Sequence, residues 1–172
     1  MLVSLQREID ARTAQIAASH GAWPCRAGCD FCCRNLAESP RLTWAEWESV
    51  SEGLAKLPNA IRAEIQQRAE QPSRVCPFLD RDAGRCLIYE YRPIACRTYG
   101  FYIERDRGLY CGQIEERVDA GEMSDVVWGN VAGVEEQLAT MGEKIGLSDW
   151  LRAIAAPAPI PSSDSPDPDA GL

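Results

Sequence analysis

Eight cysteines constrain this chain more than any other feature, because they are confined to residues 25–111 and their spacings are typical of metal ligands. The first four lie in one short segment, separated by three, two and no residues, and the last four follow at wide intervals. Short spacers let one turn of backbone present several sulfurs to one centre, as metal knuckles and cluster-binding loops require. The candidate ligands are Cys25, Cys29, Cys32, Cys33, Cys76, Cys86, Cys96 and Cys111.

Within the early group, Gly28 gives the backbone freedom immediately before Cys29. The side chains of adjacent residues tend to diverge, so we expect Cys25, Cys29 and Cys32 to be ligands ahead of Cys33. Four sulfurs from the early group and four from the late group would suffice for two zinc ions, two iron-sulfur clusters or one shared polynuclear site. The sequence leaves the number of sites open. It also leaves open whether the cofactor is zinc or an iron-sulfur cluster.

The cysteines are read as ligands because the chain gives no sign of export. No apolar run approaches the roughly 20 residues that span a bilayer, and the first helical segment carries Arg7, Glu8, Asp10 and Arg12, which do not suit a signal peptide. We therefore expect a cytoplasmic protein whose thiols are kept reduced, whereas in a secreted chain the same cysteines would indicate four disulfides. The net charge of −8 argues against a nucleic-acid or membrane partner.

Four arginines lie directly beside cysteines and could tune a thiolate site from outside its ligand shell. They are Arg26, Arg34, Arg85 and Arg97. Sixteen of the eighteen basic residues are arginines, so chance is an equal explanation for these neighbours.

The remaining pattern predicts a mostly α fold. Apolar spacing predicts helices over 2–18, from Thr43 to about Leu57, and from there to a point before Pro72, with Thr43 and Glu46 forming a capping box. Trp44 and Trp47 are expected in the core. Segment 25–40 reads as a ligand-bearing loop and 73–112 as short turns.

Two further helices and a hairpin complete the predicted elements. A β-hairpin is predicted from segment 98–103 and the residues around Leu109 and Tyr110. An apolar stripe from Val127 to Ile145 predicts one long helix behind a Ser124 cap, followed by a short helix over 148–155. We expect one small helical domain, residues 1–155, around an irregular cysteine-rich centre, and a disordered Pro/Asp-rich tail over 156–172.

Segments containing the eight cysteines resemble a known family. They include Cys25-Arg-Ala-Gly-Cys29-Asp-Phe-Cys32-Cys33, then Cys76-Pro-Phe-Leu, then Tyr89-Glu90-Tyr-Arg92-Pro93 leading to Cys96. This pattern, over residues 23–111, closely resembles the YkgJ-type cysteine-cluster proteins, which carry a CxxCxxCC signature and are described as zinc- or iron-chelating domains. Here the first spacer has three residues rather than two. The resemblance implies metal binding, and Glu90 and Arg92 would form an ion pair or simply support the fold.

A metal-binding module with a structural or redox role is the favoured function, since eight ligands leave no obvious open coordination position. Alternatives are a cluster-dependent enzyme of methyl-transfer or redox type and a metal-delivery factor. An enzyme is disfavoured because there is one histidine, no defensible catalytic triad and no phosphate-binding glycine loop. The spacing Cys25-x3-Cys29-x-Phe31-Cys32 also matches a radical S-adenosylmethionine loop, but no βα repeat accompanies it.

Overall fold

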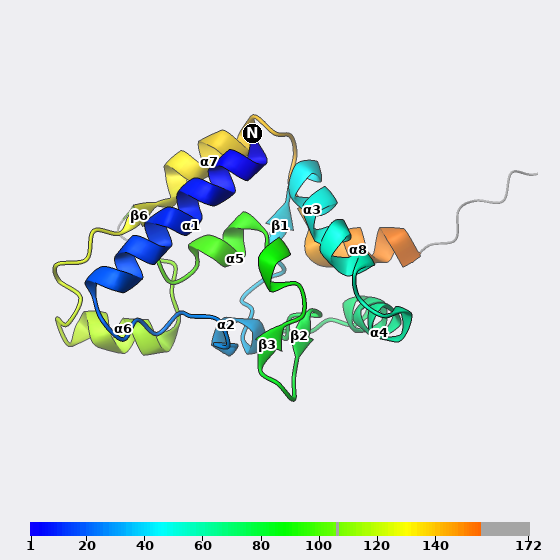
Figure 1. The fold of residues 1–172 in the computed structure, drawn as a ribbon, viewed down its shortest axis with the longest axis horizontal. Coiled ribbons are helices and arrows are strands. Elements are labelled where there is room, and N and C mark those ends of the chain that lie inside the picture. Colours follow the sequence, from blue (N-terminus) through cyan, green and yellow to red (C-terminus); the bar gives the residue numbers. More distant parts are fainter. Residues whose placement is uncertain (106, 156–172) are drawn as a thin grey trace, which may run out of the picture.

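A computed structural model describes residues 1–105 and 107–155 (Figure 1). The fold is mostly α with short strands, as the sequence predicts. The helices are α1 (Leu2–Ser19), α2 (Phe31–Arg34), α3 (Trp44–Ala55), α4 (Asn59–Glu70), η1 (Tyr89–Tyr91, a 3-10 turn), α5 (Ile94–Thr98), α6 (Gly112–Asp119), α7 (Val131–Ala139) and α8 (Leu147–Ala155). The strands are β1 (Arg41–Leu42), β2 (Leu79–Asp80), β3 (Arg85–Cys86), β4 (Tyr102–Glu104), β5 (Arg107–Gly108), β6 (Gly129–Asn130) and β7 (Ile145–Gly146). The tail predicted over 156–172 lies outside the described residues.

The predicted helices of the N-terminal half are confirmed. The α1 helix buries Leu5, Ile9 and Ile16 on one face, as the apolar spacing required. At the start of α3 the Thr43 side chain accepts from the Glu46 backbone amide while the Glu46 carboxylate accepts from the Thr43 amide, which is a complete capping box.

Short strand pairs tie distant segments together. The predicted hairpin is present as β4 and β5, and a second antiparallel pair, β2 and β3, carries Cys86. Strand β6 pairs in parallel with β4, and β1 pairs with β7 near the end of the described chain. These ladders hold the cysteine-bearing turns between helices that are too short to fix them alone.

The prediction of one long helix over 127–145 is wrong. Helix α7 spans only Val131–Ala139, and the side chain of Asn130, not Ser124, caps it by accepting from the Ala132 amide. Gly129 and Asn130 are drawn into the ladder with β4, and Val127, which begins the apolar stripe, is 70% exposed. Beyond the other end, Ile145 pairs with Leu42 in a strand. Tertiary strand pairing therefore overrides the helical periodicity at both ends.

The two tryptophans of α3 have different environments. Trp47 is 4% exposed and stacks on Trp150 of α8, with 5.4 Å between ring centroids, as expected of a core residue. Trp44 is 57% exposed and meets Trp150 only edge-on, so its assignment to the core is wrong. The first position of the helix turns away from the interface that Trp47 fills.

Buried side chains form three clusters. The first joins α3, α4 and α8 to the β2–β3 hairpin, the second joins α1, α5, α7 and β4, and the third joins the end of α1 to α6. Figure 1 shows α1 and α7 side by side on one flank, α3, α4 and α8 on the other, and α2 with the β2–β3 hairpin between the flanks. Five cysteines belong to or pack against these clusters: Cys33, Cys76 and Cys86 with the first, and Cys25 and Cys111 with the third.

Candidate metal centre

The early cysteines lie on a tight turn followed by a single helical turn. The Cys29 amide donates to the Arg26 carbonyl over 3.0 Å, and Gly28 adopts φ +87°, a left-handed conformation that favours glycine. Asp30 then precedes α2, and the side chain of Asp30 pairs with Arg34 one turn later, at 2.6 Å. What the sequence predicted as a loop over 25–40 thus contains a short helix that carries Cys32 and Cys33.

The thiols of Cys32 and Cys33 approach each other instead of diverging. Their Sγ atoms are 4.0 Å apart, within reach of a weak thiol hydrogen bond and far beyond a disulfide bond. All eight cysteines are free. Two sulfurs bound to one tetrahedral zinc at its usual bond length would lie about 3.8 Å apart. Thiols at this separation are therefore suitable neighbours in or between metal sites.

Backbone hydrogen bonds attach the segment that precedes the β2–β3 hairpin to the end of α2 and the residues after it. The Cys76 amide donates to the Cys33 carbonyl over 2.7 Å, and the Leu36 amide donates to the Arg74 carbonyl over 2.7 Å. Segments some forty residues apart in sequence therefore run side by side, and Cys76 is brought next to Cys33.

One group of thiols gathers on this side of α2, and we call it the hairpin-side set: Cys33, Cys76, Cys86 and Cys96. Cys86 lies on β3, opposite Leu79, and Cys96 lies in α5. Cys76 and Cys86 are close enough to raise the pKa of Cys33 electrostatically, and Cys33 and Cys86 do the same to Cys96. The wide spacing in sequence is therefore closed by the fold.

The second group lies toward α6, and we call it the α6-side set: Cys25, Cys29 and Cys111. Cys111 and Cys29 both raise the pKa of Cys25, and Cys111 precedes α6 at its N-cap position. Gly100, at φ +85°, provides the space for Cys25, because a Cβ built on this glycine would lie 2.3 Å from the Cys25 Sγ. A hydrogen bond from the Gly100 amide to the Leu109 carbonyl joins the segment of Gly100 to the segment that leads to Cys111.

Cys32 links the two sets. It is near enough to raise the pKa of Cys25 on one side and of Cys86 and Cys96 on the other, and it contacts Cys33 directly. The division into an early and a late group of four is therefore not spatial: Cys111 joins the early Cys25, and the early Cys33 joins the late cysteines. Only the tertiary structure shows this exchange.

Thiols in this environment resist ionisation. Burial, with a contribution from Cys111, raises the pKa of Cys25 to about 12, and burial also raises the pKa of Cys96. The hydrogen bond with Cys33 and burial raise the pKa of Cys32. For Cys33, the bond with Cys32 lowers the pKa, but the Cys76 thiol and burial outweigh it and bring the pKa to about 12. So many adjacent thiolates would repel one another unless a cation neutralised them.

Arg92 is a cation that acts on these thiols. It lowers the pKa of both Cys86 and Cys96, and its guanidinium lies over the Tyr89 ring, 3.5 Å from the centroid, while donating to the Tyr89 carbonyl. The family resemblance predicts that Arg92 pairs with Glu90 or supports the fold. Among the ion pairs found within the described residues, none joins Arg92 to Glu90. The only sequence feature that could have indicated a role for Arg92 near the thiols is its position in the Tyr89–Pro93 motif.

The four arginines adjacent to cysteines in sequence are directed mainly elsewhere. Arg34 and Arg85 pair with Asp30 and Asp80, and Arg26 is exposed. The fourth, Arg97, is buried, and its guanidinium pairs with Asp10 of α1 at 2.6 Å and donates to the carbonyls of Glu90 and Arg92. Arg97 thus fixes the backbone that precedes α5, and with it the position of Arg92.

A buried carboxylate fixes the other side of α5. Glu46 is 1% exposed, and its Oε1 accepts from the Ile94 amide over 2.9 Å while its Oε2 accepts from the Thr43 amide over 2.9 Å and from the Thr43 hydroxyl. One side chain therefore satisfies the first turns of both α3 and α5, where unpaired amides favour a negative charge. The capping box, visible in sequence, did not reveal this contact with the helix that carries Cys96.

The donor chemistry of the centre fits a thiophilic metal. Eight uncrosslinked thiols, two on α2 and six from other segments, lie near one another, and soft thiolate ligands suit zinc and iron-sulfur clusters. In residues 1–105 and 107–155, no three Cys, His, Asp or Glu side chains are arranged to hold one metal ion as they stand. Metal binding thus requires the thiols to move from these positions.

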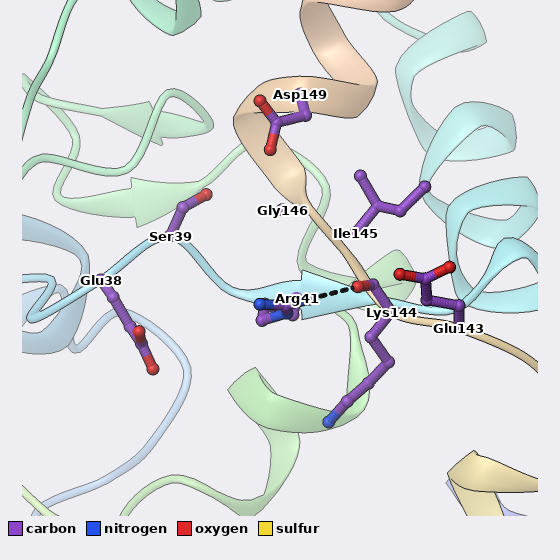
Figure 2. Close-up of a pocket in the computed structure, with 8 residues that line it drawn as sticks. All are labelled: Glu38, Ser39, Arg41, Glu143, Lys144, Ile145, Gly146 and Asp149. Atoms are coloured by element: carbon purple, nitrogen blue, oxygen red, sulfur yellow. Dashed lines mark hydrogen bonds between the residues drawn. The ribbon is translucent and has the colours of Figure 1, made fainter.

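One surface hollow lies away from the thiols. It has a volume of about 340 Å³ beside β1 and β7, and Figure 2 shows charged side chains of both signs around it, including Glu38, Arg41, Lys144 and Asp149. Arg41 is committed to the Lys144 carbonyl, which it bonds over 2.7 Å. Its lining contains no cysteine, so the hollow is not part of the candidate metal centre.

Comparison with known proteins identifies the family. The model of the CxxCxxCC family, described as "Putative zinc- or iron-chelating domain", matches residues 24–136, which is more than half of the chain. The chain belongs to this family. A CxxCxxCC domain thus includes α2, the β2–β3 hairpin, α5 and α6, and the match confirms the resemblance seen in the cysteine pattern.

Searches of curated proteins and of solved structures each found no match to this CxxCxxCC protein. Within the described part of the chain, no helix has the length and apolar character needed to cross a membrane. The family description supports zinc or iron as the bound metal.

Proposed function

We propose that this protein binds metal in two adjacent four-thiolate sites and that the metals hold its loop-rich centre together. The observation that carries the proposal is the convergence on α2 of eight free thiols from well-separated segments. The raised pKa values of these thiols show that ionisation of one disfavours ionisation of the next, so the cluster holds thiolates at neutral pH only with a cation present. A bound cation reverses this repulsion and releases the thiol protons.

The ligands divide according to the geometry. Cys25, Cys29, Cys32 and Cys111 would form the α6-side site. Those of the hairpin-side site would be Cys33, Cys76, Cys86 and Cys96. Four thiolates close a tetrahedral site or bind one iron-sulfur cluster, with no ligand position left for substrate, which favours a structural or electron-transfer role over catalysis. Arg92 would offset the negative charge of the hairpin-side site, whereas Arg26, Arg34, Arg85 and Arg97 have weaker support in this role.

A structural role is supported by the packing around each site. Cys76, Cys33 and Cys86 pack against the first core cluster, and Cys25 and Cys111 pack against the third. Metal in both sites would join these two clusters, and we infer that residues 1–155 fold as one domain on this account. The reduced thiols that such ligation needs suit a cytoplasmic address.

The test is metal and acid-labile sulfide analysis, with an absorption spectrum, on protein purified without oxygen. Iron with stoichiometric sulfide and visible absorbance would assign iron-sulfur clusters and a redox role. Zinc without sulfide, close to two per chain, would assign a structural zinc module. Protein that carries neither metal, or that has its cysteines in disulfides, would refute the proposal.

A metal-delivery role is the second candidate. It is favoured by one observation, the partial exposure of six of the cysteine residues, through which a competing chelator could approach the metal. A structural site should lose metal only as the protein unfolds, whereas a delivery site should exchange metal at native pH with the fold intact. Circular dichroism recorded during chelator treatment separates the two roles.

A further inference from the structure

We infer that the two metal sites load cooperatively, because the single-turn helix α2 supplies one ligand to each. This inference rests on the proposed function. Cys33 lies with the hairpin-side thiols, and Cys32 lies between the two sets, where it would complete the α6-side site. The two residues are consecutive, and their Sγ atoms are 4.0 Å apart. Neither side chain can be fixed without fixing the same four-residue helix.

The structure around α2 makes this coupling favourable. Helix α2 is too short to be stable by itself, since helix nucleation is costly and most helical stability comes from tertiary contacts. On the hairpin side it is attached through the bond between the Cys76 amide and the Cys33 carbonyl, and on the other side it follows directly from the Cys25–Cys29 turn. Binding of the first metal therefore includes the entropy loss of ordering α2. The second metal binds to a helix that is already ordered, so its binding free energy is more favourable.

Charge acts against the coupling but does not cancel it. Two tetrathiolate sites this close repel each other, because each remains negative after binding a divalent ion. Arg92 lies on the hairpin side, near Cys86 and Cys96, and its positive charge would reduce the repulsion. The gain from ordering α2 once for both sites then outweighs the remaining repulsion between the two negatively charged sites.

The test is a zinc titration of the metal-stripped full chain followed by native mass spectrometry. Two independent sites, whether equal or unequal in affinity, leave at least about half of the molecules with one zinc at half loading, whereas coupling lowers that fraction. We expect the metal-free and two-zinc forms to dominate, with the second zinc bound at least about fivefold more tightly than the first. A one-zinc fraction at or above half would overturn the inference and leave the proposed function intact. No zinc binding at all would overturn both.

Two ligand variants provide an independent measurement. In Cys86→Ser the α6-side site keeps all four of its ligands, and in Cys29→Ser the hairpin-side site keeps all of its own. Coupling predicts that the intact site of each variant binds zinc at least about fivefold more weakly than in the wild type, because coupling between sites is reciprocal. Unchanged affinity at both intact sites would overturn the inference.

Discussion

Glu46 is predicted to be the most consequential carboxylate in the fold. Its two oxygens accept three hydrogen bonds, from the Thr43 amide, the Thr43 hydroxyl and the Ile94 amide, inside a fully buried site. In Glu46→Gln the shape is kept, but one oxygen becomes an NH₂ group. Whichever way the amide is turned, it presents a donor to at least one of the two backbone amides.

The magnitude follows from these contacts. A buried donor left unpaired costs about 1–3 kcal/mol, and hydrogen bonds to a charged acceptor contribute about 1.5–3 kcal/mol each, against roughly 1 for a neutral one. Losing one bond and the charge assistance of the others should lower the free energy of unfolding by about 2–4 kcal/mol. The α5 helix, and Cys96 with it, would lose its attachment to α3.

Urea unfolding of the metal-loaded protein measures this loss, as a lower midpoint at an unchanged m value. The matched control is Glu48→Gln, which removes an exposed carboxylate from the same helix and should change the free energy by no more than about 0.5 kcal/mol. If Glu46→Gln unfolded at the wild-type midpoint, the carboxylate would not be joining α3 to α5, and the reasoning would be refuted.

Three further outcomes are expected. Trp47→Ala should cost about 3–5 kcal/mol in urea unfolding and Trp44→Ala about 1 kcal/mol or less, since only Trp47 is buried, and equal losses would contradict the packing described for α3. Gly100→Ala should lower the metal content, because its Cβ would collide with the Cys25 Sγ. Gly121→Ala, with a similar positive φ but open space around its Cβ, should bear only backbone strain, so equal metal loss in both variants would exclude the thiol contact as the cause. In metal-free protein the pKa of Cys25 is raised from 9.0 to about 12, so stability is fully present below about pH 9 and should fall as the pH rises toward 12. Thermal melts across that range test this, and a gain in stability with rising pH would contradict it.

Local sequence signals predicted the elements whose causes are local. The apolar spacing of Leu5, Ile9 and Ile16 fixes the buried face of α1, and the Thr43–Glu46 capping box fixes where α3 begins. The hairpin of β4 and β5 was likewise predicted from neighbouring segments, 98–103 and the residues around Leu109, although its second strand is Arg107–Gly108. The prediction of a helix over 127–145 was wrong because residues at both ends of this segment pair with strands that are distant in sequence. Periodicity describes what a segment prefers, and a ladder with a distant strand can outweigh that preference.

For the candidate site, the sequence by itself determined the chemistry. Eight thiols in a CxxCxxCC-type pattern identify a zinc- or iron-chelating protein, because ligand type and short spacing are properties of the chain alone. Only the tertiary structure decided the partition of the thiols, with Cys111 beside Cys25 and Cys33 beside Cys76. The same holds for Arg92, and for Glu46, whose carboxylate reaches an amide 48 residues away. Spacings of nine or more residues allow almost any assembly of the late cysteines, and backbone bonds such as that from Cys76 to Cys33 select one of them.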